Sequence, residues 1–278
     1  MRYGIFSDIH SNVEALDAVI QAYRTEDIDK YLCIGDIVGY AANPNECIEK
    51  AKMLAMISAA GNHDRACVNL FSADYLNPFA KEAVIWTQSN LDGQSKYFLE
   101  HLPFIYKNED LTMVHGTLDE PQDFHYMSDG YTASKTFGLL ETDVCFVGHT
   151  HVPGIFIHSQ QENLAIHSED EQRLLSINHS RPRPLGRGSR RLIKSENANI
   201  AYQKESGINI KEGNKYIIDV GSVGQPRDGN PEAAYCIYDT KKKNIEIKRV
   251  SYDIQAARGK IINAGLPGFL AERLLLGR

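Results

Sequence analysis

Short apolar runs alternate with amphipathic stretches through the first half of the chain. Residues 3–7 and 31–34 are compact apolar runs, which is the pattern of buried strands. Between them, residues 12–23 carry apolar side chains at helical spacing, and residues 44–57 begin with Pro44, which suits the first turn of a helix. This order of strand, helix, strand and helix predicts a sheet that is covered by helices.

The second half of the chain changes from this alternation to consecutive strands. Residues 78–90 still have helical character, and apolar strand-like runs return at 111–115 and 144–147. The last third holds three strand-like runs separated by short turns, which predict adjacent antiparallel strands, followed by a helical end. These four segments are residues 215–220, 234–238, 245–252 and 253–276.

Residues 159–213 interrupt the pattern because they are polar and weakly periodic. A compact domain rarely contains so long a segment without regular structure. We therefore predict a single domain over residues 1–278, with a polar surface excursion at about 159–213 that is partly mobile or folds as a small flap. This segment contains six basic residues with no acidic residue between them, which could attract nucleotide phosphates or RNA. A solvated loop is the simpler interpretation. The basic residues are Arg181, Arg183, Arg187, Arg190, Arg191 and Lys194.

The composition is that of an ordinary globular protein. Of 278 residues, 42% are hydrophobic and 24% are charged, and the formal net charge of −6 argues against an overall attraction to nucleic acid. The five cysteines are widely spaced without a CxxC pair, which favours reduced, buried thiols. We find no apolar segment long enough for a leader or a membrane span, and we expect a cytoplasmic protein.

Polar side chains of metal-ligand type follow five apolar runs at the points where the runs end. In wound α/β sheets, ligands collect beyond the carboxyl ends of strands, so we expect these segments to converge on one crevice. Residues i and i+2 of an extended backbone point to the same side, which would let each Asp-x-His or His-x-His pair face one pocket. The segments are Asp8-Ile9-His10, Gly35-Asp36, Gly61-Asn62-His63-Asp64, His115-Gly116 and Gly148-His149-Thr150-His151.

The ordered Asp-x-His, Gly-Asp, Gly-Asn-His-Asp, His and Gly-His-x-His blocks closely resemble those of the calcineurin-like metallophosphoesterases. The resemblance continues into residues 221–228 and the helical end, which are similar to the small bacterial and archaeal branch of phosphodiesterases and diadenosine tetraphosphatases. It implies an α/β fold, a four-layer α/β/β/α sandwich of two mixed sheets flanked by helices, with a dimetal site at one edge of the sheets.

The resemblance also implies a ligand for each position of a two-metal cage. Asp8, His10 and His151 would hold one cation, Asn62, His115 and His149 would hold the other, and Asp36 would bridge both. Imidazole with carboxylate and amide oxygen suits two divalent ions, Mn²⁺ first, with Fe, Zn²⁺, Ni²⁺ or Co²⁺ as alternatives. Such a pair of cations would activate a bridging hydroxide that attacks phosphorus directly, without a covalent enzyme intermediate.

Six further residues are candidates for catalysis or substrate binding. We assign His63 to donate a proton or hydrogen bond to the leaving oxygen, and Asp64 to orient the imidazole, although Asp64 could instead cap the next helix. The remaining candidates lie beside motifs, where they could bind phosphate or line the pocket: Arg65, Arg227, Tyr40 and Asn43.

Two departures from the family pattern limit the choice of function. Residues 39–41 read Gly-Tyr-Ala where the eukaryotic protein phosphatases have an arginine that holds phosphate, and Asp219 stands where the small-branch relatives commonly have Asn. We therefore expect a small, nucleotide-like phosphodiester, phosphomonoester or dinucleoside polyphosphate as substrate. The alternatives are a catalytically idle scaffold with this fold and an RNA-directed phosphoesterase that uses the cations of residues 181–194. The oligomeric state stays open.

Overall fold

The computed structural model describes residues 1–159, 191–192, 200–204 and 206–278. The predicted flap lies mostly outside these described residues, as does the cation run apart from the backbone of β8 (Arg191–Leu192). The described residues on either side form β7 (Gly154–Ser159), β9 (Ile200–Gln203) and β10 (Gly207–Asn209). Parts of the polar segment therefore belong to the sheets.

The first sheet is mixed. Parallel pairing joins β1 to β2 and β2 to β3, while β1, β12, β13 and β10 pair antiparallel in turn. From edge to edge the order is β10, β13 (Asn244–Val250), β12 (Ala233–Asp239), β1 (Arg2–Phe6), β2 (Lys30–Cys33) and β3 (Ile57–Ser58).

The second sheet is also mixed and packs face to face with the first. Its order is β4 (Ile105–Lys107), β5 (Thr112–Val114), β6 (Val144–Val147), β11 (Asn214–Asp219), β7, β9 and β8. Apolar side chains of both sheets share one core, in which the Phe146 ring lies 5.7 Å from that of Tyr238. The sheets therefore bury their facing surfaces against each other.

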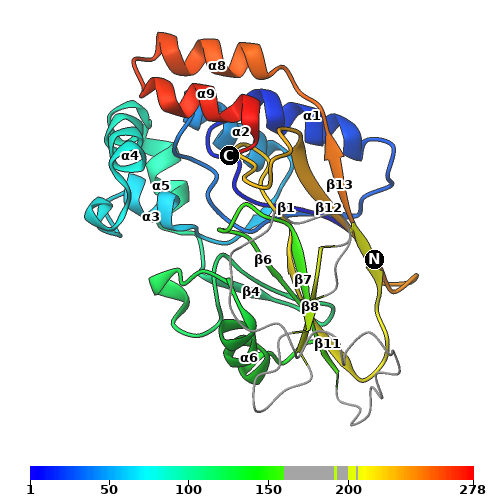
Figure 1. Ribbon diagram of the computed structural model, residues 1–278. Helices are drawn as coiled ribbons and strands as arrows, with labels where there is room; N and C mark the ends of the chain where they lie inside the picture. Colours follow the sequence, from blue (N-terminus) through cyan, green and yellow to red (C-terminus); the bar gives the residue numbers. More distant parts are fainter. Residues whose placement is uncertain (160–190, 193–199, 205) are drawn as a thin grey trace, which may run out of the picture.

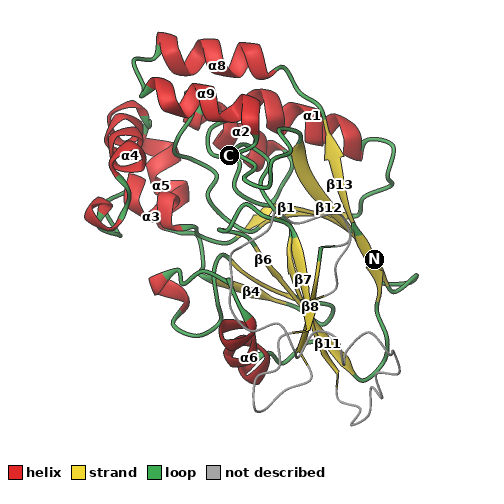
Figure 2. Ribbon diagram, viewed as in Figure 1, coloured by secondary structure: helices red, strands yellow, loops and turns green. Residues whose placement is uncertain are grey.

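Helices cover the outer faces of the two sheets, which confirms the predicted four-layer α/β/β/α sandwich (Figures 1 and 2). On the second sheet, α6 (Gly130–Leu139) buries Ala133 and Phe137 against β6 and β11. The other helices gather on the side of the first sheet, where α1 buries Leu16 and Val19. They are α1 (Val13–Tyr23), α2 (Pro44–Met53), α3 (Asn62–Cys67), α4 (Pro78–Asn90), α5 (Gly93–Glu100), α8 (Ile254–Asn263) and α9 (Gly268–Leu276), with short 3₁₀ turns at Ala73–Tyr75 and Pro121–Asp123.

Two predicted helix boundaries and one predicted strand neighbour are wrong. The helix predicted over 44–57 ends at Met53, because Ala55 takes a left-handed φ of 47° and the chain then enters β3. The helical end divides into α8 and α9, because Gly265 (φ 73°) and Pro267 interrupt it. The antiparallel pairing of β12 with β13 is confirmed. The run at 215–220, however, belongs to the other sheet, where β11 lies between β6 and β7.

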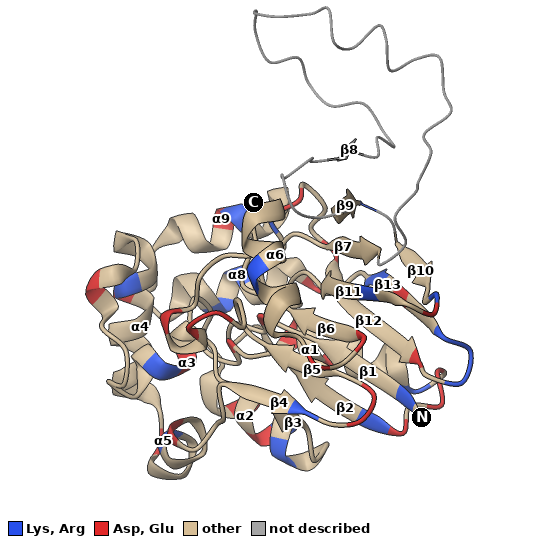
Figure 3. Cartoon of the chain, turned by 90° about the horizontal axis from the view of Figure 1, so that it is seen from below, with Lys and Arg blue, Asp and Glu red and all other residues tan. Residues whose placement is uncertain are grey.

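Charge is distributed without a single dominant sign over the described part of the chain. Lys and Arg are interspersed with Asp and Glu over the helices, strands and connections (Figure 3). Among the described residues, no helix combines the length and the apolar character that a membrane crossing requires.

Candidate metal centre

The predicted ligands come from segments that follow strands of both sheets. Asp8 follows β1 and Asp36 follows β2, while His115 follows β5 and His149 follows β6. Asn62 is the first residue of α3, shortly after β3. All of these side chains are buried. The convergence beyond strand ends that the sequence predicts is therefore present at the junction of the two sheets.

The backbone at these positions is left-handed rather than extended. The φ angles of Asp8, His10 and Asp36 are 55°, 50° and 52°, and those of His149 and His151 are 68° and 62°. The expectation that i and i+2 side chains align on an extended strand is therefore wrong, because β1 and β6 end before the ligands. Asp and His tolerate this region of backbone space better than most residues do.

The ligand atoms form two groups that meet at Asp36. In one group, Asp8, His10 and His151 place their ligand atoms within 4.8 Å of one another, and in the other Asp36, His115 and His149 do the same. The Asp36 Oδ2 atom is 3.3 Å from His115 Nε2 and 3.7 Å from His10 Nε2. Asp36 thus lies between the groups, where a bridging ligand would have to be.

Three of the histidine rings are held with Nε2 directed into the centre. The other ring nitrogen, Nδ1, lies within hydrogen-bond distance of a backbone carbonyl in each: Val38 for His10 (3.2 Å), Ile34 for His115 (3.0 Å) and Gln225 for His151 (2.6 Å). Donation from Nδ1–H fixes the tautomer in which Nε2 carries the free lone pair. This is the arrangement that a metal-binding imidazole needs.

Several buried polar atoms of the centre lack a hydrogen-bond partner among the described residues. They are Asp8 Oδ1, Asp36 Oδ2, Asn62 Oδ1 and His115 Nε2. The second oxygen of each carboxylate is satisfied, since Asp8 Oδ2 accepts from the His149 amide (3.1 Å) and Asp36 Oδ1 accepts from the His63 amide (2.8 Å). Unpaired buried acceptors are costly unless a cation or a donor meets them. The residues present therefore fit divalent cations.

The charges of the centre favour ionised carboxylates. Burial would raise the pKa of both Asp8 and Asp36, but the surrounding histidines hold the pKa of each carboxyl well below its usual range. Burial lowers the pKa of His151 to about 4. Burial also acts to lower the pKa of His115, but the charge and hydrogen bond of Asp36, together with the charges of Asp8 and Asp64, outweigh it and raise that pKa to about 9. A cation that binds at neutral pH would consequently displace a proton from His115.

Comparison with known proteins identifies the family. The sequence profile of the calcineurin-like phosphoesterase superfamily domain matches residues 1–178. An uncharacterized protein of Methanocaldococcus jannaschii is 37% identical over 279 residues, which cover 99% of this chain and 97% of that protein. The chain belongs to the calcineurin-like phosphoesterase superfamily.

Solved structures agree with this assignment. The crystal structure of a metallophosphoesterase from Sphaerobacter thermophilus is 34% identical and superposes with a TM-score of 0.77, covering 100% of each chain. A hypothetical protein from Pyrococcus horikoshii has the same fold at 17% identity, with a TM-score of 0.71 and coverage of 100% of this chain and 98% of that one. The family depends on two metal ions, and the buried Asp and His groups of this chain could bind them.

The structure places His63 beside the metallophosphoesterase centre but gives Asp64 a different role from the one predicted. The buried His63 ring lies 4.9 Å from the His10 ring, and its Nδ1 has no hydrogen-bond partner among the described residues. Asp64 does not orient it. Its Oδ1 accepts from the amides of Ile37 (2.9 Å) and Val38 (3.2 Å), and its Oδ2 accepts from the Gly61 amide (3.0 Å). Asp64 therefore caps the start of α3 by accepting from the Gly61 amide, and it ties α3 to the turn after Asp36.

Arg65, which we predicted to bind substrate, is engaged between α3 and the end of α5. Its guanidinium donates to the carbonyls of Glu100 (2.8 Å) and Leu102 (2.5 Å) and lies 4.7 Å from the centre of the Phe104 ring. The side chain is only 8% exposed. Arg65 points from α3 towards the end of α5, and it serves to hold these two segments together.

Arg227 and Tyr40 do lie at the centre. The Tyr40 ring is 4.6 Å from the His10 ring and 4.5 Å from the His63 ring, and the Arg227 Nη2 atom donates to the Tyr40 hydroxyl at 3.3 Å. The backbone amide of Arg227 donates to the carbonyl of His151 at 3.2 Å. Asn43 differs: its side chain donates to Glu46 at the start of α2 (2.9 Å), which leaves its predicted role without a contact to the centre among the described residues.

Tyr126 is a neighbour of the centre that the sequence did not indicate. It stacks on His149, with ring centroids 3.9 Å apart and planes inclined by 13°. Tyr126 lies between β5 and α6, in a connecting segment with neither helical nor strand periodicity. No motif marks it, so only the folded backbone reveals its position.

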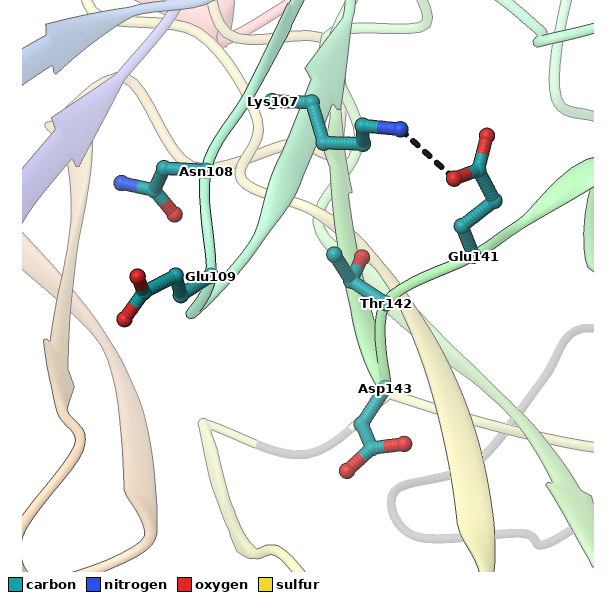
Figure 4. A pocket seen from close by; sticks show the side chains of 6 residues that line it. All are labelled: Lys107, Asn108, Glu109, Glu141, Thr142 and Asp143. Carbon is teal, nitrogen blue, oxygen red and sulfur yellow. Dashed lines mark hydrogen bonds and ion pairs between the residues drawn. The ribbon is translucent and has the colours of Figure 1, made fainter.

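A surface hollow lies away from the metallophosphoesterase centre (Figure 4). It measures about 410 Å³ and is lined by Lys107, Asn108, Glu109, Glu141, Thr142 and Asp143. These residues precede β5 and β6, whereas His115 and His149 follow the same strands. The hollow is therefore at the opposite ends of the strands, and the ion pair between Lys107 and Glu141 crosses it (2.6 Å).

Proposed function

We propose that this chain hydrolyses small phosphate esters with the help of two divalent cations, Mn²⁺ being the first candidate. The observation that carries the proposal is the position of Asp36, whose unpartnered Oδ2 lies between the two groups of buried Asp and His ligands. Asp8, His10 and His151 would hold one cation, Asn62, His115 and His149 the other, and Asp36 both.

The residues of the chain would then have distinct tasks in the reaction. Two cations, when bound, supply a water of lowered pKa and neutralise the charge on the phosphoryl oxygens. His63 faces the same space, and its Nδ1 has no hydrogen-bond partner in the described part of the chain. It would donate a proton or a hydrogen bond to the leaving oxygen. Arg227 would bind a phosphate oxygen and orient the substrate.

A small, nucleotide-like phosphodiester or phosphomonoester is the substrate that we propose. The chain lacks the Asp-Arg-Gly element of the protein phosphatases, and Tyr40 occupies the corresponding stretch, packed against His10 and His63. The positive side chain that would bind phosphate is instead Arg227, on the connection between β11 and β12. A buried tyrosine at this point narrows the site, which favours small substrates over folded phosphoproteins.

The test combines metal analysis with turnover of bis- and mono-p-nitrophenyl phosphate. The wild type should hold two metal ions per chain and turn over at least one substrate with Mn²⁺. Asp36→Asn keeps the shape of the side chain but removes its charge from both metal sites, so this variant should lose metal and activity together. A folded wild type that remains inactive with Mn²⁺, Fe²⁺, Co²⁺, Ni²⁺ and Zn²⁺ would refute the proposal and favour a scaffold.

The role of His63 is tested separately with substrates of graded leaving-group pKa. His63→Ala should retain metal and lose turnover, with the smaller loss on the better leaving groups, because these need less help to depart. Equal losses across the whole series would remove its assigned role at the leaving oxygen.

A further inference from the structure

Tyr126 presents an open aromatic surface directly beside the candidate metal centre. Its ring stacks on His149 at 3.9 Å, yet 50% of the residue is exposed. Aromatic residues with one covered and one open face are the usual platforms for flat, π-bonded ligands. The open area lies next to a predicted metal ligand, so a ligand stacked there would be adjacent to a phosphate at the centre.

The segment that carries Tyr126 is anchored on both sides. Phe124 and Met127 are buried, at 5% and 3% exposure. The Phe124 ring packs edge-on against Phe71 at 5.4 Å, and it is 6.0 Å from His115. A Cβ placed on Gly116 would come within 2.5 Å of the His125 carbonyl oxygen, so the backbone at Gly116 is in close contact with the segment that carries Tyr126. Tyr126 is therefore held in place before any ligand arrives.

A positively charged side chain lies at the same centre as this surface. The Arg227 Nη2 atom donates to the Tyr40 hydroxyl (3.3 Å), and the Arg227 backbone amide donates to the carbonyl of His151 (3.2 Å), two residues from the His149 on which Tyr126 stacks. Arg227 has neutral hydrogen-bond partners, Tyr40 and Gln225, and no carboxylate within 4.0 Å among the described residues. Its charge is thus available to an anion. A small molecule that carries both a flat ring and a phosphate could therefore contact Tyr126 and Arg227 at the same time.

We infer that Tyr126 is a stacking platform for the nucleobase of a nucleoside phosphate whose phosphate group binds at the metal centre beside Arg227. The inference rests on the proposed function for the position of the phosphate, and it narrows the substrate to nucleotides or nucleotide esters. Stacking is tolerant of base identity because every base has a π face, so the platform selects for a base rather than for a particular one.

Affinity for two matched ligands tests this platform. AMP and ribose 5-phosphate share the sugar and the phosphate and differ only in the base. The dissociation constants of their phosphonate analogues, in which a methylene group replaces the ester oxygen and prevents hydrolysis, are measured by calorimetry on the Mn²⁺-loaded full chain, wild type, Tyr126→Phe and Tyr126→Leu. Tyr126→Leu should weaken AMP by about 5- to 30-fold, the equivalent of about 1–2 kcal/mol of stacking. Ribose 5-phosphate should change by less than about 2-fold, and Tyr126→Phe should retain the preference for AMP.

A second tyrosine provides the matched control. Tyr131 on α6 is 67% exposed and packs against Lys135, not against the centre, so Tyr131→Leu should leave both affinities unchanged. Tyr126 could instead serve only to pack the His149 ring. In that case Tyr126→Leu would weaken AMP and ribose 5-phosphate equally, or lower the metal content, and the platform would be refuted. A wild type that does not prefer AMP would also refute it. Because binding is measured directly, failure of hydrolysis is detected separately.

Discussion

Four consecutive residues at the start of α3 have four different environments. Asn62 directs an unpartnered oxygen into the centre, and His63 lies against the His10 ring. Asp64 holds the turn after Asp36, and Arg65 reaches the end of α5. The motif in the sequence marks this segment correctly. It does not reveal that the segment is helical, and helical rotation sends each neighbouring side chain in a different direction.

The contrast between the two arginines can be measured. Arg65→Met should lower the free energy of unfolding by about 2 kcal/mol, because the buried Leu102 carbonyl and the part-buried Glu100 carbonyl lose a charged donor, and it should leave KM unchanged. Arg227→Met should keep the stability and raise KM by about 10-fold, because a charge-assisted contact to phosphate is lost. Denaturant unfolding and steady-state kinetics on both variants give the comparison. The reverse pattern would restore the sequence-based assignment of Arg65.

Asp219 connects a departure from the family pattern to pH. It is buried at the end of β11, where it accepts from the Thr150 hydroxyl (2.5 Å) and the Gly221 amide (2.9 Å). Burial raises its pKa well above the ordinary value, in spite of these hydrogen bonds. Thr150 separates His149 from His151, so Asp219 also holds the segment that carries two predicted ligands.

Replacing Asp219 should therefore stabilise the protein in a pH-dependent way. The unfolded carboxyl ionises above about pH 4, whereas the folded one keeps its proton to higher pH. Stability is lost as pH rises from the unfolded to the folded pKa, because the folded state binds more protons. Relative to wild type, Asp219→Asn should therefore become progressively more stable as the pH rises from about 4 to about 8. Denaturant unfolding at both pH values tests this. A difference that is independent of pH would contradict it.

At the scale of elements, the turns after the strands approach one another so closely that they exclude side chains. A Cβ on Gly61 would lie 2.0 Å from Asp36 Oδ1, and one on Gly148 would lie 2.1 Å from Ser7 Oγ. Glycine permits this close approach because it has no Cβ, and the approach brings ligand segments of different strands together. The Gly35 turn and the start of α3 therefore form one unit around Asp36.

Adding a single methyl group should disturb this unit. Gly61→Ala must displace Asp36, so we expect one of the two metal ions to be lost and turnover to fall by about 100-fold. The measurements are metal content and kcat/KM. Gly93→Ala is the control, since nothing lies within 4 Å of its Cβ at the start of α5. Its effect should be neutral or slightly stabilising. Normal metal content in Gly61→Ala would show that the turn adapts.

At the scale of the whole molecule, the two sheets meet at the centre. Residues after β1, β2 and β3 come from the first sheet, and those after β5 and β6 come from the second. The strand ends and their order could be predicted from the sequence, because apolar runs and ligand motifs are local. The sheet to which β11 belongs could not be predicted from the sequence. Its residues Tyr216 and Ile217 face different cores, but both belong to one continuous apolar run that does not distinguish the two sheets.

Cations held from both sheets should stabilise the molecule as a whole. A ligand at 100 times its dissociation constant adds about 2.7 kcal/mol, which in a chain of this size corresponds to about 5–10 °C in Tm. Calorimetry of the EDTA-treated protein with and without Mn²⁺ measures the shift. Asp36→Asn, which lacks the residue shared by the two groups, should show a smaller one. Equal shifts in both proteins would indicate that Mn²⁺ binds elsewhere.

The left-handed backbone at the ligands bears on how the chain has been selected. Asp8, His10, Asp36, His149 and His151 are all at positive φ, where glycine would be relieved of a strain of roughly 1 kcal/mol at each position. Glycine at these positions would avoid the Cβ clash of the left-handed backbone and so favour folding. The chain still carries carboxylates and imidazoles at these strained positions. A catalytically idle scaffold of this fold would not need carboxylates and imidazoles at these positions.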